Sequence, residues 1–173
     1  MTAGDDAFFE LRFSPRPAMI ATVREFVCDF YAQVLEDEDS STRLAMATYE
    51  MLENCVRHGV DGRSMIHIVA HRAHDRIVVR IETKNRATHE QLSRARAALD
   101  GVAGAEDANA YYLTLLNRAA IRTDGGSGLG LGRIRAEGDL SVTYEIENDM
   151  LRVLVTGEFA PWGEGARVSE VMP

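Results

Sequence analysis

Residues 49–59 read YEMLENCVRHG, and this stretch decides which fold the chain is expected to adopt. It belongs to a long helical pattern that stops at Gly59, the residue type that most often follows the last turn of a helix. Glu50, Asn54 and His58 are four residues apart, so a helix projects all three from one face. A carboxylate, an amide and an imidazole on an otherwise apolar helix need partners, because unpaired polar groups in a core are costly.

Two interpretations of this polar stripe are open when it is taken alone. In the functional one, the Asn54 oxygen is a ligand for the Mg²⁺ of a nucleotide, and Glu50 orients or deprotonates a nucleophile. In the structural one, the stripe is a solvated face on which Glu53 pairs with Arg57 one turn later.

Length and charge limit the classes of protein that are possible. The 173 residues suit one domain, predicted over residues 1–160, with a weakly ordered tail over residues 161–173. A net charge of −8 argues against a nucleic-acid partner, since affinity for nucleic acid rests largely on Lys and Arg against phosphate. The first residues carry no apolar signal segment and no later run reaches membrane-spanning length, so we expect a cytoplasmic protein without a membrane contact. Cys28 and Cys55 both fall in helical patterns and are expected to be buried thiols.

Hydrophobic periodicity predicts an alternation of helical and strand segments. A second helix is expected from Thr42 to His58, capped by Ser40 or Ser41 after an acidic loop at 36–39. Before it, we expect a strand at 8–13 and a helix from Ile20 to Val34; after it, a hairpin of 65–70 with 77–82 and a third helix capped near Thr88. A loop at 101–107 then leads to a fourth helix, in which Tyr111, Tyr112, Leu115 and Leu116 are expected to form a packing face. The last expected elements are a short helix at 133–138 and a closing hairpin of 140–147 with 151–159 around Asn148 and Asp149.

The predicted first hairpin contains His67, His71 and His74. The first two fall on one face of a strand, but no carboxylate or cysteine completes a ligand set there. We therefore expect exposed strand residues in place of a metal site.

A second polar feature is the glycine-rich run DGGSGLGLG at 124–132. Glycines let backbone N–H groups approach a phosphate, and a helix that follows directly presents further donors to an anion. Ser127 adds a hydroxyl, and Arg133 or Arg135 a cation. The run lacks the Gly-Lys-Ser/Thr of a P-loop, and it follows a helix where a dinucleotide fingerprint would follow a strand. A plain flexible linker is the alternative.

The order of these features resembles the GHKL (Bergerat-fold) ATPase family, in particular its small anti-sigma-factor serine kinases. Residues 50–59 look like the N-box of that branch and residues 126–131 like its second glycine box; the resemblance covers residues 40–158. It implies an α/β (α+β) two-layer sandwich, with a mixed, mostly antiparallel sheet and helices on one face.

The resemblance also implies roles for individual residues. Glu50 would be the base for a protein hydroxyl, and Asn54 would bind Mg²⁺. The phosphates of ATP would be covered by a loop that contains Gly126, Ser127, Gly128, Leu129 and Gly130.

One position departs from the family pattern. The family places Asp-x-Gly-x-Gly after the hairpin, where this chain has Glu82-Thr83-Lys84-Asn85-Arg86. Asn85 would then offer adenine a neutral contact in place of the Asp. The SiaB-type subgroup of small bacterial kinases looks similar in both its glycine box and an Asn at this place.

Three functions remain open at this stage. The first is a Mg²⁺- and ATP-dependent serine/threonine kinase that acts on a small regulatory protein. The second is a degenerate, non-catalytic domain that sequesters a sigma-like partner, and the third is a scaffold without a ligand. A complete histidine kinase is not expected, because no separate dimerisation domain with a phospho-accepting His fits in the chain. The first helix could support a homodimer.

Overall fold

A computed structural model describes residues 6–14, 16–35, 37–60, 64–73, 75–121 and 129–160. Helices and strands follow one another in the order β1 (Ala7–Phe13), α1 (Pro17–Leu35), α2 (Glu38–His58), β2 (Ser64–Ala73), β3 (Arg76–Arg86), α3 (His89–Ala103), α4 (Ala108–Ile121), α5 (Gly130–Ala136), β4 (Ser141–Glu147) and β5 (Met150–Phe159).

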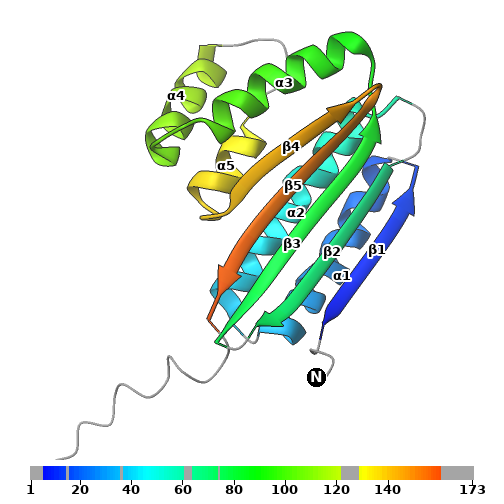
Figure 1. Ribbon diagram of the computed structural model, residues 1–173, viewed down its shortest axis with the longest axis vertical. Coiled ribbons are helices and arrows are strands. Elements are labelled where there is room, and N and C mark those ends of the chain that lie inside the picture. The colour runs from blue at the N-terminus through cyan, green and yellow to red at the C-terminus, as the bar shows by residue number, and fades with distance from the viewer. Residues whose placement is uncertain are drawn as a thin grey trace, which may run out of the picture.

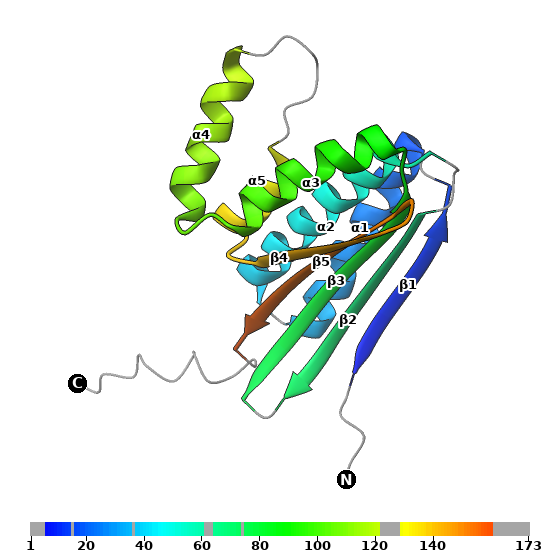
Figure 2. The same ribbon diagram turned by 45° about the horizontal axis from the view of Figure 1, so that its top comes forward.

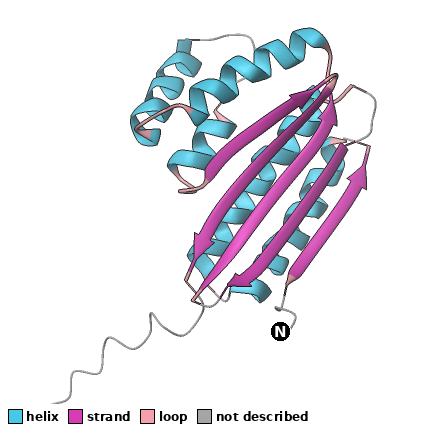
Figure 3. Ribbon diagram, in the orientation of Figure 1, coloured by secondary structure: helices cyan, strands magenta, loops and turns pink. Residues whose placement is uncertain are grey.

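The strands form one sheet in the order β1-β2-β3-β5-β4, and every neighbouring pair is antiparallel. Helices α1 and α2 lie against one face of this sheet, and the opposite face is open (Figures 1 and 3). The predicted two-layer α+β sandwich is confirmed. The sheet was expected to be mixed, mostly antiparallel; among the described strands all pairs are antiparallel.

Alternation along the strands creates the two faces of the sheet. Ile66 and Ile68 of β2 point into the core, as does Ile81 of β3 directly opposite Ile68. His67 and His71 lie on the other face, where His71 pairs with the Asp6 carboxylate. They are strand residues of the open face, as expected, although His67 is half-buried; His74 lies outside the described residues.

Helix α2 begins four residues earlier than predicted. Asp37 is its N-cap, because the Asp37 Oδ2 accepts a hydrogen bond of 3.0 Å from the Ser40 backbone N–H. Ser40 and Ser41 are buried inside the helix and do not cap it, so both predicted caps are wrong. The acidic run was predicted as loop, but Glu38 and Asp39 form the first turn, where carboxylates favour the helix dipole.

The core between α1 and α2 includes one buried polar contact. The Tyr31 hydroxyl is 2.9 Å from Thr48 Oγ1, and Thr48 Oγ1 in turn donates to the Leu44 carbonyl. Burial raises the pKa of Tyr31, so the phenol stays neutral. Cys55 is buried as predicted, but Cys28 is exposed, which corrects the prediction that both thiols are inside.

The sequence-based predictions for α3 and α4 are correct in part. Thr88 caps α3 with a reciprocal Thr88–Gln91 capping box, as predicted. The helix then continues to Ala103, so the predicted loop at 101–107 is three residues too long at its start. No residue of α4 is fully buried and Leu116 is exposed, so the predicted packing face is correct only for the half-buried Tyr111, Tyr112 and Leu115.

Helix α5 and the closing hairpin complete the described chain. Helix α5 begins at Gly130 and ends at Ala136, three residues ahead of its predicted start. Asn148 adopts a positive φ of 54° between β4 and β5, which confirms the predicted turn. Within the described residues, no helix combines the length and the apolar character that a membrane crossing requires.

The N-cap of α2 provides a test of this architecture. Asp37→Ala should lower the free energy of unfolding by ~1 kcal/mol, because the Ser40 N–H loses its acceptor. Asp37→Asn is the matched control, since an Asn oxygen can also cap. Urea denaturation at neutral pH measures both variants, and an equal loss in both would show that the cap is not the cause.

The same cap should depend on pH. The hydrogen bonds from Ser40 lower the pKa of Asp37 below its usual value. A lowered pKa stabilises the fold above the unfolded-state value, and this stabilisation is lost as the pH falls through the folded-state value. The stability difference between wild type and Asp37→Asn should therefore shrink on acidification.

Candidate functional site

Helix α2 carries the two predicted site residues on the side that faces α5. The Glu50 side chain is 15% exposed, and Asn54 is half-buried one turn later. Within the described part of the chain, the Asn54 side chain makes no hydrogen bond, so its amide oxygen has no competing donor there. Both side chains occupy the border between core and solvent, where a ligand can reach them.

The start of α5 lies directly against Glu50. A Cβ atom built on Gly130 would be 2.5 Å from Glu50 Oε2 and 3.3 Å from its carboxyl carbon. A larger residue at position 130 would displace the carboxylate, so the close approach requires glycine. The end of the glycine-rich run and the polar helix, eighty positions apart in sequence, therefore lie in contact.

Arg133 of α5 bridges two carboxylates at this contact. Its Nη1 lies 3.2 Å from Glu50 Oε1, and its Nε donates to Glu137 Oε2 at 2.7 Å. Burial raises the pKa of Glu50, and the hydrogen bond from Arg133 opposes the rise without cancelling it. Arg133 was predicted as a cation for phosphate; in this structure it is bound to carboxylates, a pairing that sequence reasoning missed.

Helix α4 is held beside the site through another glycine. A Cβ on Gly132 would be 2.6 Å from Leu115 Cδ1 and 3.3 Å from Tyr112 Cδ2, so α4 packs closely on α5. Burial, together with Glu137, raises the pKa of Tyr112. Figure 2 shows α4 projecting from the body of the domain next to α5.

Arg135, the other predicted phosphate cation, binds backbone carbonyls at the end of α3 and just after it. Its guanidinium donates to the carbonyls of Val102 and Ala105. It holds backbone carbonyls and has a structural role in this conformation.

Asn85 lies on the inner face of β3, and its side chain is already engaged. The residue is 4% exposed, its Nδ2 donates to the Arg86 carbonyl at 3.3 Å, and its Oδ1 accepts from Cys55 Sγ at 3.8 Å. Burial raises the pKa of Cys55 to about 11, so the thiol is protonated, and Thr83 contacts the same sulfur. Cys55 and Thr83 were not predicted as neighbours of Asn85. The alternation along β3 could have indicated part of this, because residues 81, 83 and 85 all point to the same inner face.

Three of the predicted phosphate residues, Gly126, Ser127 and Gly128, lie outside the described residues. Leu129 and Gly130 are described and mark the end of α5 that touches Glu50. The phosphate-binding role assigned to all five residues stays a prediction.

The Glu53–Arg57 pair of the structural interpretation also exists, on the part of α2 that adjoins Glu50 toward α1. Arg57 Nη2 is 3.9 Å from Glu53 Oε2, and the Tyr49 hydroxyl donates to Glu53 at 2.7 Å. Tyr49 and Glu53 line a groove shared with α1. α2 therefore has an ion pair toward α1 directly beside the polar residues that face α5.

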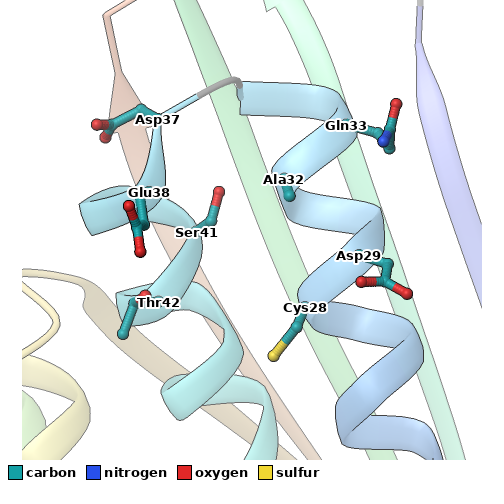
Figure 4. A pocket seen from close by; sticks show the side chains of 8 residues that line it. All are labelled: Cys28, Asp29, Ala32, Gln33, Asp37, Glu38, Ser41 and Thr42. Carbon is teal, nitrogen blue, oxygen red and sulfur yellow. The ribbon is translucent and has the colours of Figure 1, made fainter.

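A further groove between α1 and α2, of about 680 Å³, is shown in Figure 4. Its lining residues are Cys28, Asp29, Ala32, Gln33, Asp37, Glu38, Ser41 and Thr42. It contains none of the predicted site residues. The contact between α2 and α5 is therefore the candidate site on chemical grounds, since it brings a half-buried carboxylate and an amide to the start of α5.

Comparisons with known proteins address the family and the fold of the chain. Residues 13–153 match the model of the family described as histidine kinase-like ATPase domain. No curated protein matches the sequence. A solved structure that resembles the chain is the crystal structure of the SiaB–SiaC complex from Pseudomonas aeruginosa, with a TM-score of 0.61, 11% identity, and coverage of 87% of this chain and 89% of that chain.

At this identity the structural likeness shows the fold alone, whereas the family match covers most of the chain. The GHKL resemblance drawn from the two motifs is confirmed. This chain belongs to the histidine kinase-like (GHKL) ATPase domain family.

Proposed function

We propose that this protein is a Mg²⁺- and ATP-dependent serine/threonine kinase that phosphorylates a small regulatory protein. The observation that carries the proposal is the contact of Glu50 with Gly130, one turn from Asn54, whose amide has no hydrogen-bond partner among the described residues. Membership of an ATPase family supports ATP as the phosphoryl donor. The cytoplasmic location expected from the sequence belongs to the same proposal.

Asn54 is the residue that would hold the metal. Its oxygen is of the hard type that Mg²⁺ prefers, and no partner among the described residues occupies it. The described residues contain no group of three or more His, Cys, Asp or Glu side chains that could bind a metal without help. Such a site suits an ion that arrives with a nucleotide and keeps waters and phosphate oxygens as its other ligands; when bound, Mg²⁺ neutralises charge on those phosphates.

Glu50 would act as the general base. The partner's hydroxyl oxygen forms a bond to the γ-phosphorus, the bond from that phosphorus to the β–γ bridging oxygen breaks, and ADP leaves. The hydroxyl proton passes to the Glu50 carboxylate, whose raised pKa makes it a better proton acceptor than an exposed Glu. Arg133 must release Glu50 or share it for this transfer to occur, because a carboxylate held in an ion pair is a weaker base.

Two observations support a protein as the phosphate acceptor. The SiaB–SiaC structure is a complex of that relative with a second protein. In this chain, α4 stands next to the site and exposes Leu113, Leu116 and Ile121, which is apolar surface suited to a protein contact.

The second candidate function is a non-catalytic domain that sequesters a regulatory protein. It is favoured by the absence of Asp-x-Gly-x-Gly at residues 82–86 and by the buried state of Asn85. A side chain already bound to Cys55 and to Arg86 has less hydrogen-bonding capacity left for adenine. Glu50 argues against this second candidate function, because a domain that only binds a partner does not require a half-buried carboxylate.

Substitutions in α2 should separate metal binding from proton transfer. Asn54→Ala should abolish Mg-ATP binding, measured by calorimetry. Glu50→Gln should retain binding and lower the rate of partner phosphorylation by roughly 10²-fold or more, because the base is removed while the metal ligand remains. Glu53→Gln is the control, since it removes the same charge from the side of the helix that faces α1.

The same calorimetry distinguishes the two candidate functions. A micromolar affinity for Mg-ATP, about −8 kcal/mol, would exclude a lost nucleotide site. No heat with ATP or ADP, together with tight partner binding, would overturn the kinase and support the sequestering domain. If Glu50→Gln lost binding and transfer together, the assigned division of roles would be wrong.

The raised pKa of Glu50 predicts a pH-dependent cost to stability. Burial makes the folded state bind the proton more tightly than the unfolded state does, so both states are protonated below the unfolded-state pKa and no cost arises there. As the pH rises through the folded-state pKa, ionisation penalises the folded state. Glu50→Gln should therefore gain stability relative to wild type as the pH rises above the usual range of a Glu carboxyl, measured by urea titrations. An unchanged difference would show that Arg133 fully compensates the buried charge.

A further inference from the structure

A pair of buried polar side chains lies where β2 begins and β3 ends (Figure 1). Ser64 is the first residue of β2, and the register of the two strands places it directly opposite Asn85. Both residues belong to the inner face of the sheet, and each is only 4% exposed. Directly opposed residues of antiparallel strands have their Cβ atoms roughly 5 Å apart, so the hydroxyl and the amide are neighbours.

This pair adjoins the candidate site through the end of α2. Cys55 follows Asn54 in that helix, and the Cys55 sulfur lies 3.8 Å from Asn85 Oδ1. The backbone N–H of Val60 donates to the Arg86 carbonyl at 3.1 Å, so the segment after α2 is fixed to the end of β3. The polar pair therefore lies beneath the part of α2 that carries Asn54.

Ser64 has a hydroxyl that the fold does not use. Its Oγ is buried and has no hydrogen-bond partner within the described part of the chain. A buried hydroxyl without a partner is costly, and most such groups in native proteins bind a protein atom or an ordered water. A polar ligand that reaches Ser64 would gain a hydrogen bond that the protein alone does not make.

Asn85 keeps half of its hydrogen-bonding capacity. A side-chain amide has two N–H donors and two acceptor lone pairs, of which one N–H goes to the Arg86 carbonyl and one lone pair to the Cys55 thiol. Both contacts are easily exchanged, because the Arg86 carbonyl also accepts from Val60 and a thiol is a weak donor. One donor and one acceptor therefore remain for a ligand.

These two groups suit either purine base. A carboxylate can only accept, so it favours the 6-amino group of adenine and repels the 6-oxo group of guanine. A hydroxyl and an amide can each donate or accept, and Ser64 and Asn85 can therefore satisfy both groups. Discrimination against a competitor requires an unpaired or like charge placed against it, and neither side chain supplies one.

We propose that Ser64 and Asn85 together form the base-contacting end of the nucleotide site, and that this site binds ATP and GTP with similar affinity. The inference rests on the proposed function, because it requires a nucleoside triphosphate on the α2 face that carries Glu50 and Asn54. Ser64 is then a further binding residue, and the neutral pair determines how little the site distinguishes between the purines.

Calorimetry with Mg-ATP, Mg-GTP and inorganic tripolyphosphate tests the tolerance. In the wild-type chain the affinities for ATP and GTP should agree within about fivefold, and both should exceed the affinity for tripolyphosphate. Asn85→Asp should increase the preference for ATP over GTP by roughly tenfold or more, because a carboxylate rejects the 6-oxo group. Asn109→Asp makes the same change at an exposed position of α4 and should leave the ratio as it is.

Ser64→Ala tests the second residue. Because it removes an unpaired buried hydroxyl, the thermal stability of the nucleotide-free chain should stay the same or increase. The affinities for ATP and GTP should both fall by roughly fivefold, while the affinity for tripolyphosphate should not change. Ser93→Ala, at an exposed position of α3, is the matched control.

The possible failures are distinguishable from one another. Wild-type protein that binds ATP but prefers it to GTP by more than about tenfold would overturn this inference and leave the proposed kinase intact. Protein that binds neither nucleotide would overturn the proposed function and this inference with it. A Ser64→Ala chain that loses stability, or that weakens tripolyphosphate binding as much as ATP binding, would overturn the assignment of Ser64 to the base.

Discussion

The close contact between the Glu50 carboxylate and Gly130 is the constraint on which the site depends. It joins α2, which belongs to the core beside the sheet, to α5, which follows the glycine-rich run. Because glycine has no side chain, the N-terminus of α5 comes within reach of the carboxylate, and Arg133 then offsets part of the cost of burial. The offset is incomplete, as the raised pKa of Glu50 shows. A partly uncompensated carboxylate beside the start of α5 lowers the stability of the fold, and the proposed chemistry would use that same carboxylate as a base.

The two ends of the candidate nucleotide site differ in chemical character. At the proposed phosphate end, the Asn54 amide has no hydrogen-bond partner within the described part of the chain, and the first turn of α5 lies nearby. At the end where the family has Asp-x-Gly-x-Gly, Asn85 is buried and hydrogen-bonded to the backbone and to Cys55. A neutral amide that must break existing contacts gives less discrimination between bases than a free carboxylate would. Recognition in this chain would therefore rest more on the triphosphate and its metal than on the base.

Local signals predicted most of the architecture. The hairpins, the end of α2 and the cap at Thr88 each depend on residues close in sequence, so propensity and turn chemistry suffice to find them. The start of α2 was missed because Asp37, Ser40 and Ser41 are all good caps, and only packing shows that both serines are buried. Cys28 and α4 were misjudged for a related reason: an apolar pattern indicates which residues can be buried, and the position of the neighbouring element decides which are.

For the candidate site, the sequence indicated which side chains of α2 share a face, but not which residues they contact. Spacing along one helix placed Glu50 and Asn54 together, but the pairing of Glu50 with Arg133 joins residues 83 positions apart and follows only from the position of α5. Sequence assigned Arg133 to a phosphate because an arginine after a glycine loop is available to an anion. In the folded chain the nearest anion is a protein carboxylate, and it occupies the guanidinium first. If a phosphate binds here as proposed, it and the carboxylate would compete for one arginine, so phosphate binding would change the basicity of Glu50.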